Sequence, residues 1–169
     1  NPMNSFASPT GFWSDDRVVL HFGRYGTFCL DAESGKVVWQ NALVIDDSMG
    51  PGSSIVEHGG VVVVPCDGMD RQFVAGLSLE TGKEVWRTAR PEMPSKHGEF
   101  HKSYASPLLI EVNGHTQAIV PGAHWCVAYA PKTGQEIWRF HHGTGFSIAP
   151  APAYVDGKVI FSSGYGSKE

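Results

Sequence analysis

Short apolar runs bounded by turn residues recur along the whole chain. Four of them are rich in β-branched residues and follow a turn, at 16–20, 60–64, 117–120 and 157–161. Runs of this kind are typical of strands, and no segment of comparable length shows the apolar spacing of about 3.6 residues that marks a helix. The pattern therefore predicts an all-β chain of short strands joined by tight turns.

A six-residue motif ends each of three repeats. It reads SGKVVW at 34–39, TGKEVW at 81–86 and TGQEIW at 133–138. The tryptophans of successive motifs are 47 and 52 residues apart, a period typical of propeller blades. Before each motif stand a segment of small residues, often with proline, then a β-branched run and a third apolar run. Each repeat therefore predicts a four-stranded antiparallel meander.

Such a sheet cannot bury both of its faces alone, and sheets stacked around an axis solve this problem. The sequence thus predicts a partial β-propeller, a single domain over residues 1–169. We expect blades at about 6–40, 52–87 and 103–139, and an incomplete fourth at 147–169. The motif glycines should take positive φ in hairpin turns, and the motif tryptophans should fill the gap between neighbouring blades. These blade-docking residues are Gly35, Trp39, Gly82, Trp86, Gly134 and Trp138.

The repeated pattern Leu/Tyr-x-x-x-Ser/Thr-Gly-x-x-Val/Ile-Trp resembles that of the PQQ-like β-propeller repeat family. Segments such as Phe22-Gly23, 50–54 and 66–68 are most similar to those of its secreted bacterial members. The resemblance implies that the Trp motif docks neighbouring blades and that the protein is extracytoplasmic, either periplasmic or secreted. It also implies a ring of seven or eight blades, of which this sequence contains about three.

Three blades alone would leave two apolar sheet faces open to water, a larger apolar area than monomers usually expose. We therefore expect further blades of the same protein to cover these faces. The alternative is that several copies of a partial ring assemble, which requires angular closure.

Composition and charge mainly exclude some classes of partner and site. The formal net charge is −4 and no basic run is present, so nucleic acid is not an expected partner. No apolar stretch approaches the roughly 20 residues that span a bilayer. Cys29, Cys66 and Cys126 lie far apart and form no CxxC pair, and each adjoins an apolar run. They are expected to be small buried apolar residues rather than metal ligands or nucleophiles.

Polar and titratable side chains concentrate in the loops that should open on one face of the propeller. Asp46 and Asp47 belong to this face, as does the insert 90–104 with Glu99. Binding residues of rigid scaffolds commonly lie on such loops. The candidate ligand-binding residues are Asp67, Asp70, Arg71, His97, His101, His124, Trp125, His141 and His142.

Each candidate has a simpler structural interpretation. His97 and His101 are four residues apart, but Gly98 favours a loop in which they would not share one side, so solvated or locally bonded histidines are the default over a metal site. Asp67 and Asp70 would suit Ca²⁺, but the segment lacks the regular acidic alternation and terminal Glu of an EF-hand loop, so a turn built by Asp and Gly is the preferred interpretation. Trp125 would stack on a sugar or quinone, or pack in the core.

Quinoprotein dehydrogenases of the family hold PQQ and Ca²⁺ with an adjacent cysteine pair, a Glu/Asn/Asp set and a catalytic Asp. The sequence matches none of these, whereas other members, such as the outer-membrane assembly lipoprotein, only bind partners. The resemblance therefore implies a non-catalytic binding scaffold for a protein or saccharide ligand, with no catalytic residue, metal or cofactor. The alternative is part of a PQQ- and Ca²⁺-dependent quinoprotein oxidoreductase.

Overall fold

The computed structural model describes residues 5–163 and 165–166, and almost every element in it is a short strand. Three four-stranded antiparallel sheets follow one another along the chain. The first contains β1 (Phe12–Ser14), β2 (Arg17–His21), β3 (Thr27–Asp31) and β4 (Val37–Asn41). The second contains β5 (Val56–His58), β6 (Val61–Asp67), β7 (Gln72–Ser78) and β8 (Glu84–Ala89). The third contains β9 (Leu108–Val112), β10 (His115–Pro121), β11 (Trp125–Tyr129) and β12 (Glu136–His141).

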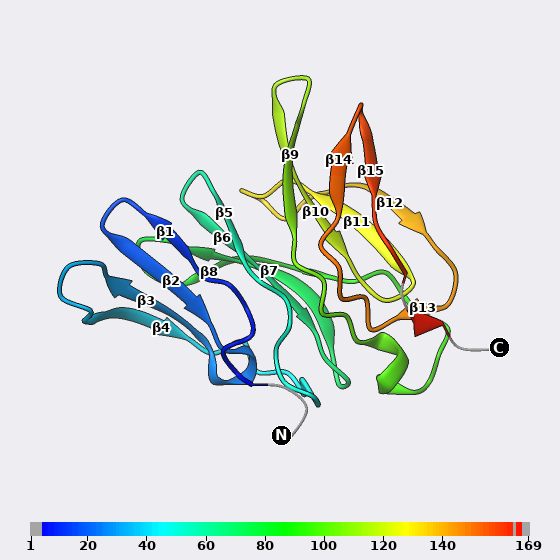
Figure 1. Cartoon of the computed structure of the whole chain (residues 1–169), viewed down its shortest axis with the longest axis horizontal. Coiled ribbons are helices and arrows are strands. Elements are labelled where there is room, and N and C mark those ends of the chain that lie inside the picture. Colours follow the sequence, from blue (N-terminus) through cyan, green and yellow to red (C-terminus); the bar gives the residue numbers. More distant parts are fainter. Residues whose placement is uncertain (1–4, 164, 167–169) are drawn as a thin grey trace.

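Two shorter pairs follow the third sheet, β13 (Gly145–Phe146) with β16 (Tyr165–Gly166) and β14 (Ala153–Val155) with β15 (Lys158–Ile160). The 3-10 helices η1 (Gly23–Tyr25) and η2 (Gly98–His101) are the helical turns of the described residues, and none of their helices is long and apolar enough to cross a membrane. The sheets succeed one another in sequence order as in a fan (Figure 1). The chain is thus all-β, an open, partial β-propeller.

The core lies between the blades. Val19 and Cys29 of the first sheet pack against Val62, Val64 and neighbouring residues of the second. Successive side chains of a strand point to opposite faces, so Val63 of the same strand β6 turns the other way, toward the third sheet. The third sheet in turn contacts the residues near β15. Each middle strand therefore serves two interblade cores, which explains its continuous apolar run.

Two of the motif tryptophans join neighbouring blades by a hydrogen bond at the same repeat position. Trp39 Nε1 donates to the Leu79 carbonyl of the second blade at 2.7 Å, and Trp86 Nε1 donates to the Pro131 carbonyl of the third at 2.9 Å. Leu79 and Pro131 both precede their turn glycine by three residues. Buried indoles normally find such a partner, and here the partner belongs to the next blade.

The side chain two residues after each of these tryptophans adds a second interblade bond. Asn41 Nδ2 donates to the Gly82 carbonyl and Thr88 Oγ1 to the Gly134 carbonyl, both at 2.7 Å. Trp138 differs, because its Nε1 donates to Gln117 Oε1 of its own blade at 2.9 Å. In the part of the chain that the structure describes, the same two-bond junction therefore occurs twice.

The turn glycines are needed for two separate reasons. Gly35, Gly82 and Gly134 have φ of 67°, 68° and 69°, a region that costs other residues energy. A Cβ on Gly82 would also lie 2.5 Å from the Trp39 ring, and one on Gly134 would overlap Trp86. Gly35 differs, since a Cβ there meets nothing within 4 Å among the described residues.

We expect Gly82→Ala to lower the free energy of unfolding by about 3 kcal/mol. The left-handed backbone contributes roughly 1–2 kcal/mol, and displacing the docked Trp39 ring adds an overpacking cost of about 1–3 kcal/mol. Gly114→Ala is the matched control because Gly114 has φ of 75° and an added Cβ there meets no described atom within 4 Å. Urea unfolding of the two variants measures the difference.

Equal losses for Gly82→Ala and Gly114→Ala would contradict the docking of Trp39 on the turn. Gly35→Ala supplies a third comparison in the full-length protein. If Gly35→Ala lowers the free energy of unfolding as much as Gly82→Ala does, a ring from outside the described residues covers Gly35. If it lowers the free energy only as much as Gly114→Ala does, the turn at Gly35 is open.

Candidate functional site

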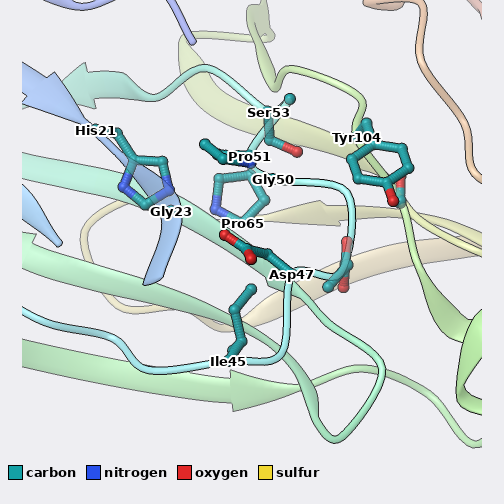
Figure 2. A pocket seen from close by; sticks show the side chains of 12 residues that line it. His21, Gly23, Ile45, Asp47, Gly50, Pro51, Ser53, Pro65 and Tyr104 are labelled. Carbon is teal, nitrogen blue, oxygen red and sulfur yellow. The ribbon is translucent and has the colours of Figure 1, made fainter. Parts of the chain in front are cut away.

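A small polar cavity lies where two interblade linkers approach the ends of the strands. The first linker, 42–55, joins β4 to β5, and the second, 90–107, joins β8 to β9. Figure 2 shows this cavity, called the linker cavity below. Its polar lining side chains are His21, Asp47, Ser53, Asp67, Ser103 and Tyr104. It offers about 20 Å³ to the centre of a water molecule, which is room for about one water.

Glycines bring the walls of the linker cavity close together. Gly23 has φ of 56°, and a Cβ on it would overlap Asp47 Oδ2 and lie 2.8 Å from Pro51 Cβ. A Cβ on Gly52 would lie 2.8 Å from Tyr104 Cβ. Side chains at these two positions would therefore push the first linker away from η1 on one side and from the second linker on the other.

Asp47 is the buried carboxylate of the first linker. It is 4% exposed, and Oδ2 accepts a hydrogen bond from the Arg24 backbone N–H at 3.2 Å. Oδ1 lies 3.3 Å from Arg24 Nε, an ion pair without hydrogen-bond geometry, and accepts no hydrogen bond from the described residues. Arg24 therefore balances the charge of Asp47, while Oδ1 can still accept a hydrogen bond.

Asp67, at the end of β6, forms a buried bidentate pair with Arg90 of the second linker. Arg90 Nε donates to Oδ1 at 2.9 Å and Nη2 to Oδ2 at 2.6 Å, while Nη1 donates to the Val120 carbonyl at 3.0 Å. Both side chains are 3% exposed or less. Burial lowers the pKa of Arg90, but the Asp67 charge outweighs it and the pKa is raised. The pair ties the second and third blades together.

His21 is a neutral group in this cavity. Its Nδ1 shares a hydrogen bond with Thr27 Oγ1 at 2.9 Å, and burial lowers its pKa from 6.5 to about 4. The imidazole therefore stays uncharged at neutral pH. The other uncharged polar groups are hydroxyls, and the Tyr104 hydroxyl meets no partner at hydrogen-bond geometry among the described residues.

The second linker is held by the chain that follows the third blade. The Tyr104 N–H donates to the Ile148 carbonyl at 2.7 Å, and Ser103 forms a parallel bridge with Ile148. Ser103 Oγ donates to the Pro121 carbonyl at 3.1 Å. These bonds hold Ser103 and Tyr104 in place as one wall of the cavity.

A second cluster of polar side chains lies in the third blade, at the turn between β10 and β11 and at the end of β12. His124 is 2% exposed in a backbone of φ 63°, and neither ring nitrogen has a partner at hydrogen-bond geometry. The rings of Trp125 and His141 are 4.5 Å apart, and those of His124 and His141 are 6.4 Å apart. The structure thus brings together four of the candidates from the sequence: His124, Trp125, His141 and His142.

Several of these side chains bond to the protein itself. His142 Nε2 pairs with the Gly122 carbonyl at 3.0 Å, and Trp125 Nε1 donates to the Glu92 carbonyl at 3.1 Å. Burial lowers the pKa of both His124 and His142. His142 and Trp125 thus have a structural use, since each holds a backbone carbonyl, whereas His124 holds none. Because two of its four side chains are engaged in this way, this group is a weaker candidate site than the linker cavity.

The remaining candidates lie in the turn between β6 and β7 and on the second linker. Asp70 Oδ1 accepts from the Asp46 N–H at 2.7 Å, and Arg71 pairs with Asp70 at 3.0 Å on the surface. His101 Nε2 pairs with the Ser95 carbonyl at 2.7 Å, and the His97 ring packs at 5.8 Å from that of Phe100. Among the candidates from the sequence, only Asp67 lines the linker cavity.

Sequence reasoning missed His21, Ser53, Ser103 and Tyr104 as cavity residues, and placed Asp47 on the loop face without singling it out. His21 ends a strand of ordinary β pattern, so nothing marks it locally. The run Gly50-Pro51-Gly52-Ser53 is a detectable signal, because two glycines around a proline permit a close approach of backbone. The partners it approaches come from other blades and cannot be read from the run.

Metal-ligating side chains and cysteines are scattered over the described residues. No group of three or more His, Cys, Asp or Glu side chains within 5–163 and 165–166 is arranged to hold a metal ion. Cys29, Cys66 and Cys126 are buried and unbonded to one another, and burial raises the pKa of Cys126 to about 12. Thiols of this kind are core residues rather than a vicinal pair beside a quinone.

A family model described as outer membrane protein assembly factor BamB matches residues 3–167. The chain belongs to this family of PQQ-like repeat propellers. Among curated relatives, quinoprotein alcohol dehydrogenase PedH of Pseudomonas putida is 29% identical over 86% of the chain and 24% of its own length. 1-Butanol dehydrogenase (quinone) of Thauera butanivorans is 30% identical over 73% of the chain and 21% of its length. The chain thus spans less than a quarter of these relatives.

Solved structures of the family share the fold. BamB from Moraxella catarrhalis superposes with a TM-score of 0.64 at 20% identity, covering 88% of this chain and 44% of that one. Quinohemoprotein alcohol dehydrogenase from Comamonas testosteroni gives 0.61 at 21% identity, covering 82% and 22%. The same blades therefore occur in proteins whose names indicate different activities, so the fold alone does not assign one.

Arg90→Lys should lower the free energy of unfolding by about 3 kcal/mol. Lysine keeps the charge but cannot make the two bonds to Asp67 and the third to Val120, and weakening a buried pair costs several kcal/mol. Arg71→Lys is the matched control, because the exposed Arg71–Asp70 pair is worth less than about 1 kcal/mol. Chemical denaturation of both variants measures the difference, and similar losses would contradict the role given to Arg90.

Acidification should weaken the fold between pH 6.5 and about 4. The pKa of His21 is lowered in the folded state, so the unfolded chain takes up the proton first and stability falls as pH decreases. A tenfold change in proton affinity is worth about 1.4 kcal/mol, so the full effect approaches roughly 3 kcal/mol. His124 and His142 act in the same direction.

His21→Asn should flatten this pH dependence in urea unfolding at pH 7 and pH 5, since an amide does not titrate. His115→Asn, at a position on the exposed hairpin, is the control and should leave the slope unchanged. An equal slope in His21→Asn and the unmodified protein would disprove the assignment to His21.

Proposed function

We propose that the chain is part of a non-catalytic β-propeller binding module of an extracytoplasmic protein, periplasmic or secreted. Its interblade linkers form the ligand face, and the ligand is a protein or a saccharide. The observation that carries this proposal is the internal pairing of charge at the linker cavity. Asp67 is neutralised by Arg90 and Asp47 by Arg24, so the groups left for a ligand are neutral.

Chemical catalysis usually requires a group whose proton affinity is matched to the working pH. His21 has a pKa of about 4 and remains an uncharged hydrogen-bonding group at neutral pH, where it is a poor proton acceptor. The carboxylates are occupied in structural pairs. An arrangement of this kind supports recognition of a ligand over proton transfer to it.

The family match supports the same proposal in part. The matched model is named for an outer membrane protein assembly factor, which suggests an extracytoplasmic protein with protein partners. The first blade also offers an apolar face, lined by Phe6, Leu20, Phe22, Tyr25, Phe28 and Leu30. Blade 2 buries the equivalent face against blade 1, so we propose that a further blade of the same protein covers this one.

The second candidate is a PQQ- and Ca²⁺-dependent oxidoreductase, favoured by the two curated relatives whose names describe quinone-dependent enzymes. In this case the cofactor would be held mainly by other parts of the protein, since the described residues offer no matching ligand set. The candidate binding residues Asp67, Asp70, Arg71, His97, His101, His124, Trp125, His141 and His142 would then contribute loops around the ring.

Titration of the full-length protein with PQQ and Ca²⁺ separates the two candidates. A quinone bound near the axis should quench nearby tryptophans, because absorption by the quinone overlaps their emission. For a binding scaffold we expect no saturable quenching beyond that of free tryptophan at the same optical density. The apoprotein of a quinoprotein dehydrogenase serves as positive control, and saturable quenching that requires Ca²⁺ would overturn the scaffold.

A further inference from the structure

The linker cavity has the size of one hydroxyl group. It offers about 20 Å³ to the centre of a water molecule, close to the minimum of roughly 10–15 Å³ that one water needs. A sugar ring does not fit into this space. A ligand bound at the linker face can therefore reach the cavity with a single small group, and a hydroxyl resembles water in being both donor and acceptor.

Asp47 points into this cavity, and one of its carboxylate oxygens can accept a further hydrogen bond. Figure 2 shows its carboxylate directed toward the side where His21 and Pro65 lie, with Tyr104 on the opposite side. Asp47 is 4% exposed, and its Oδ1 accepts no hydrogen bond from the described residues. Buried polar atoms are nearly always hydrogen-bonded, so this oxygen can accept a hydrogen bond from a group that enters the cavity.

The group that donates to Asp47 Oδ1 has to be neutral. The guanidinium of Arg24 already lies 3.3 Å from Asp47 Oδ1, so a second cation would meet a carboxylate whose charge is balanced. An anion would bring an unpaired charge into a buried cavity whose two carboxylates, Asp47 and Asp67, are already paired with arginines. His21 is uncharged at neutral pH. A hydroxyl needs no change of charge, and it can donate to Asp47 Oδ1.

We propose that the linker cavity is a subsite for one hydroxyl group of a neutral saccharide, with Asp47 as its acceptor. The proposal rests on the binding function proposed above and specifies its ligand class. The wall formed by Gly50, Pro51 and Gly52 carries no long side chain, so a sugar ring can lie against the backbone outside the cavity. The partly exposed Tyr104 ring provides an apolar surface next to it, as aromatic groups do in many ligand sites.

Saccharide binding to the full-length protein is measured by saturation-transfer difference NMR. The probes are methyl β-D-glucopyranoside, cellobiose and, as an anionic comparison, glucuronic acid at pH 7. The neutral sugars should give saturable signals, and glucuronic acid should bind at least about tenfold more weakly, as expected when a charge must be desolvated beside buried carboxylates.

Two variants locate the subsite. Asp47→Ala removes the acceptor, and Ser53→Val fills the cavity while keeping Asp47, so the second remains informative if the first does not fold. Each should weaken binding of the neutral sugars at least about tenfold, the usual loss when a hydrogen bond to a charged group disappears. Asp46→Asn is the matched control, since Asp46 is the exposed neighbouring carboxylate and does not line the cavity.

Three results would overturn the proposal. They are the absence of saturable signals for both neutral sugars up to their solubility, unchanged affinity in folded Asp47→Ala and Ser53→Val, and stronger binding of glucuronic acid than of the neutral sugars. None of these bears on the PQQ titration. A scaffold that binds only proteins would give no saturable sugar signal and no saturable quenching by PQQ. A quinoprotein would give saturable quenching in the PQQ titration.

Discussion

The insertion of an indole under the turn of the next blade is the contact on which the rest of the structure depends. Trp39 and Trp86 each bury a ring against a turn glycine and bond a carbonyl three residues before it. The apolar core between sheets is non-directional and would tolerate sliding. The hydrogen bond and the close contact at glycine are directional, so they fix the angle and height at which successive blades meet.

That fixed geometry is what allows the linkers to be polar and buried at once. The first and second linkers cross the same edge of the fan, and buried backbone and side-chain groups there need partners at set distances. Asp67 and Arg90 meet because β6 and the second linker are held in place by the blades on either side. The pair contributes little net stability compared with apolar packing, but loss of one member leaves a buried charge. Its role is to lock the linker in one conformation.

The sequence predicts the blades well because their signals are local and repeated. The glycine, the tryptophan and the β-branched run each act within a few residues, and three copies identify the period. The junction at Trp138 was less predictable, because its bond to Gln117 depends on which turn lies opposite. The cavity could not be predicted for the same reason. His21, Asp47 and Tyr104 come from three separate parts of the chain, and only the interblade geometry brings them together.

The division between repeated and unrepeated positions also bears on function. Docking residues occupy equivalent places at the two described junctions, so changing one weakens a contact of a repeated kind. The groups of the linker cavity have no such equivalents: Asp47 and Gly52 lie in the first linker, whereas the second has the longer insert with η2 in the corresponding region. Substitutions in linkers can alter the linker cavity while the indole junctions keep the blades in register. A propeller built in this way can retain its fold while its linkers change, which fits the occurrence of the same blades in proteins whose names indicate different activities.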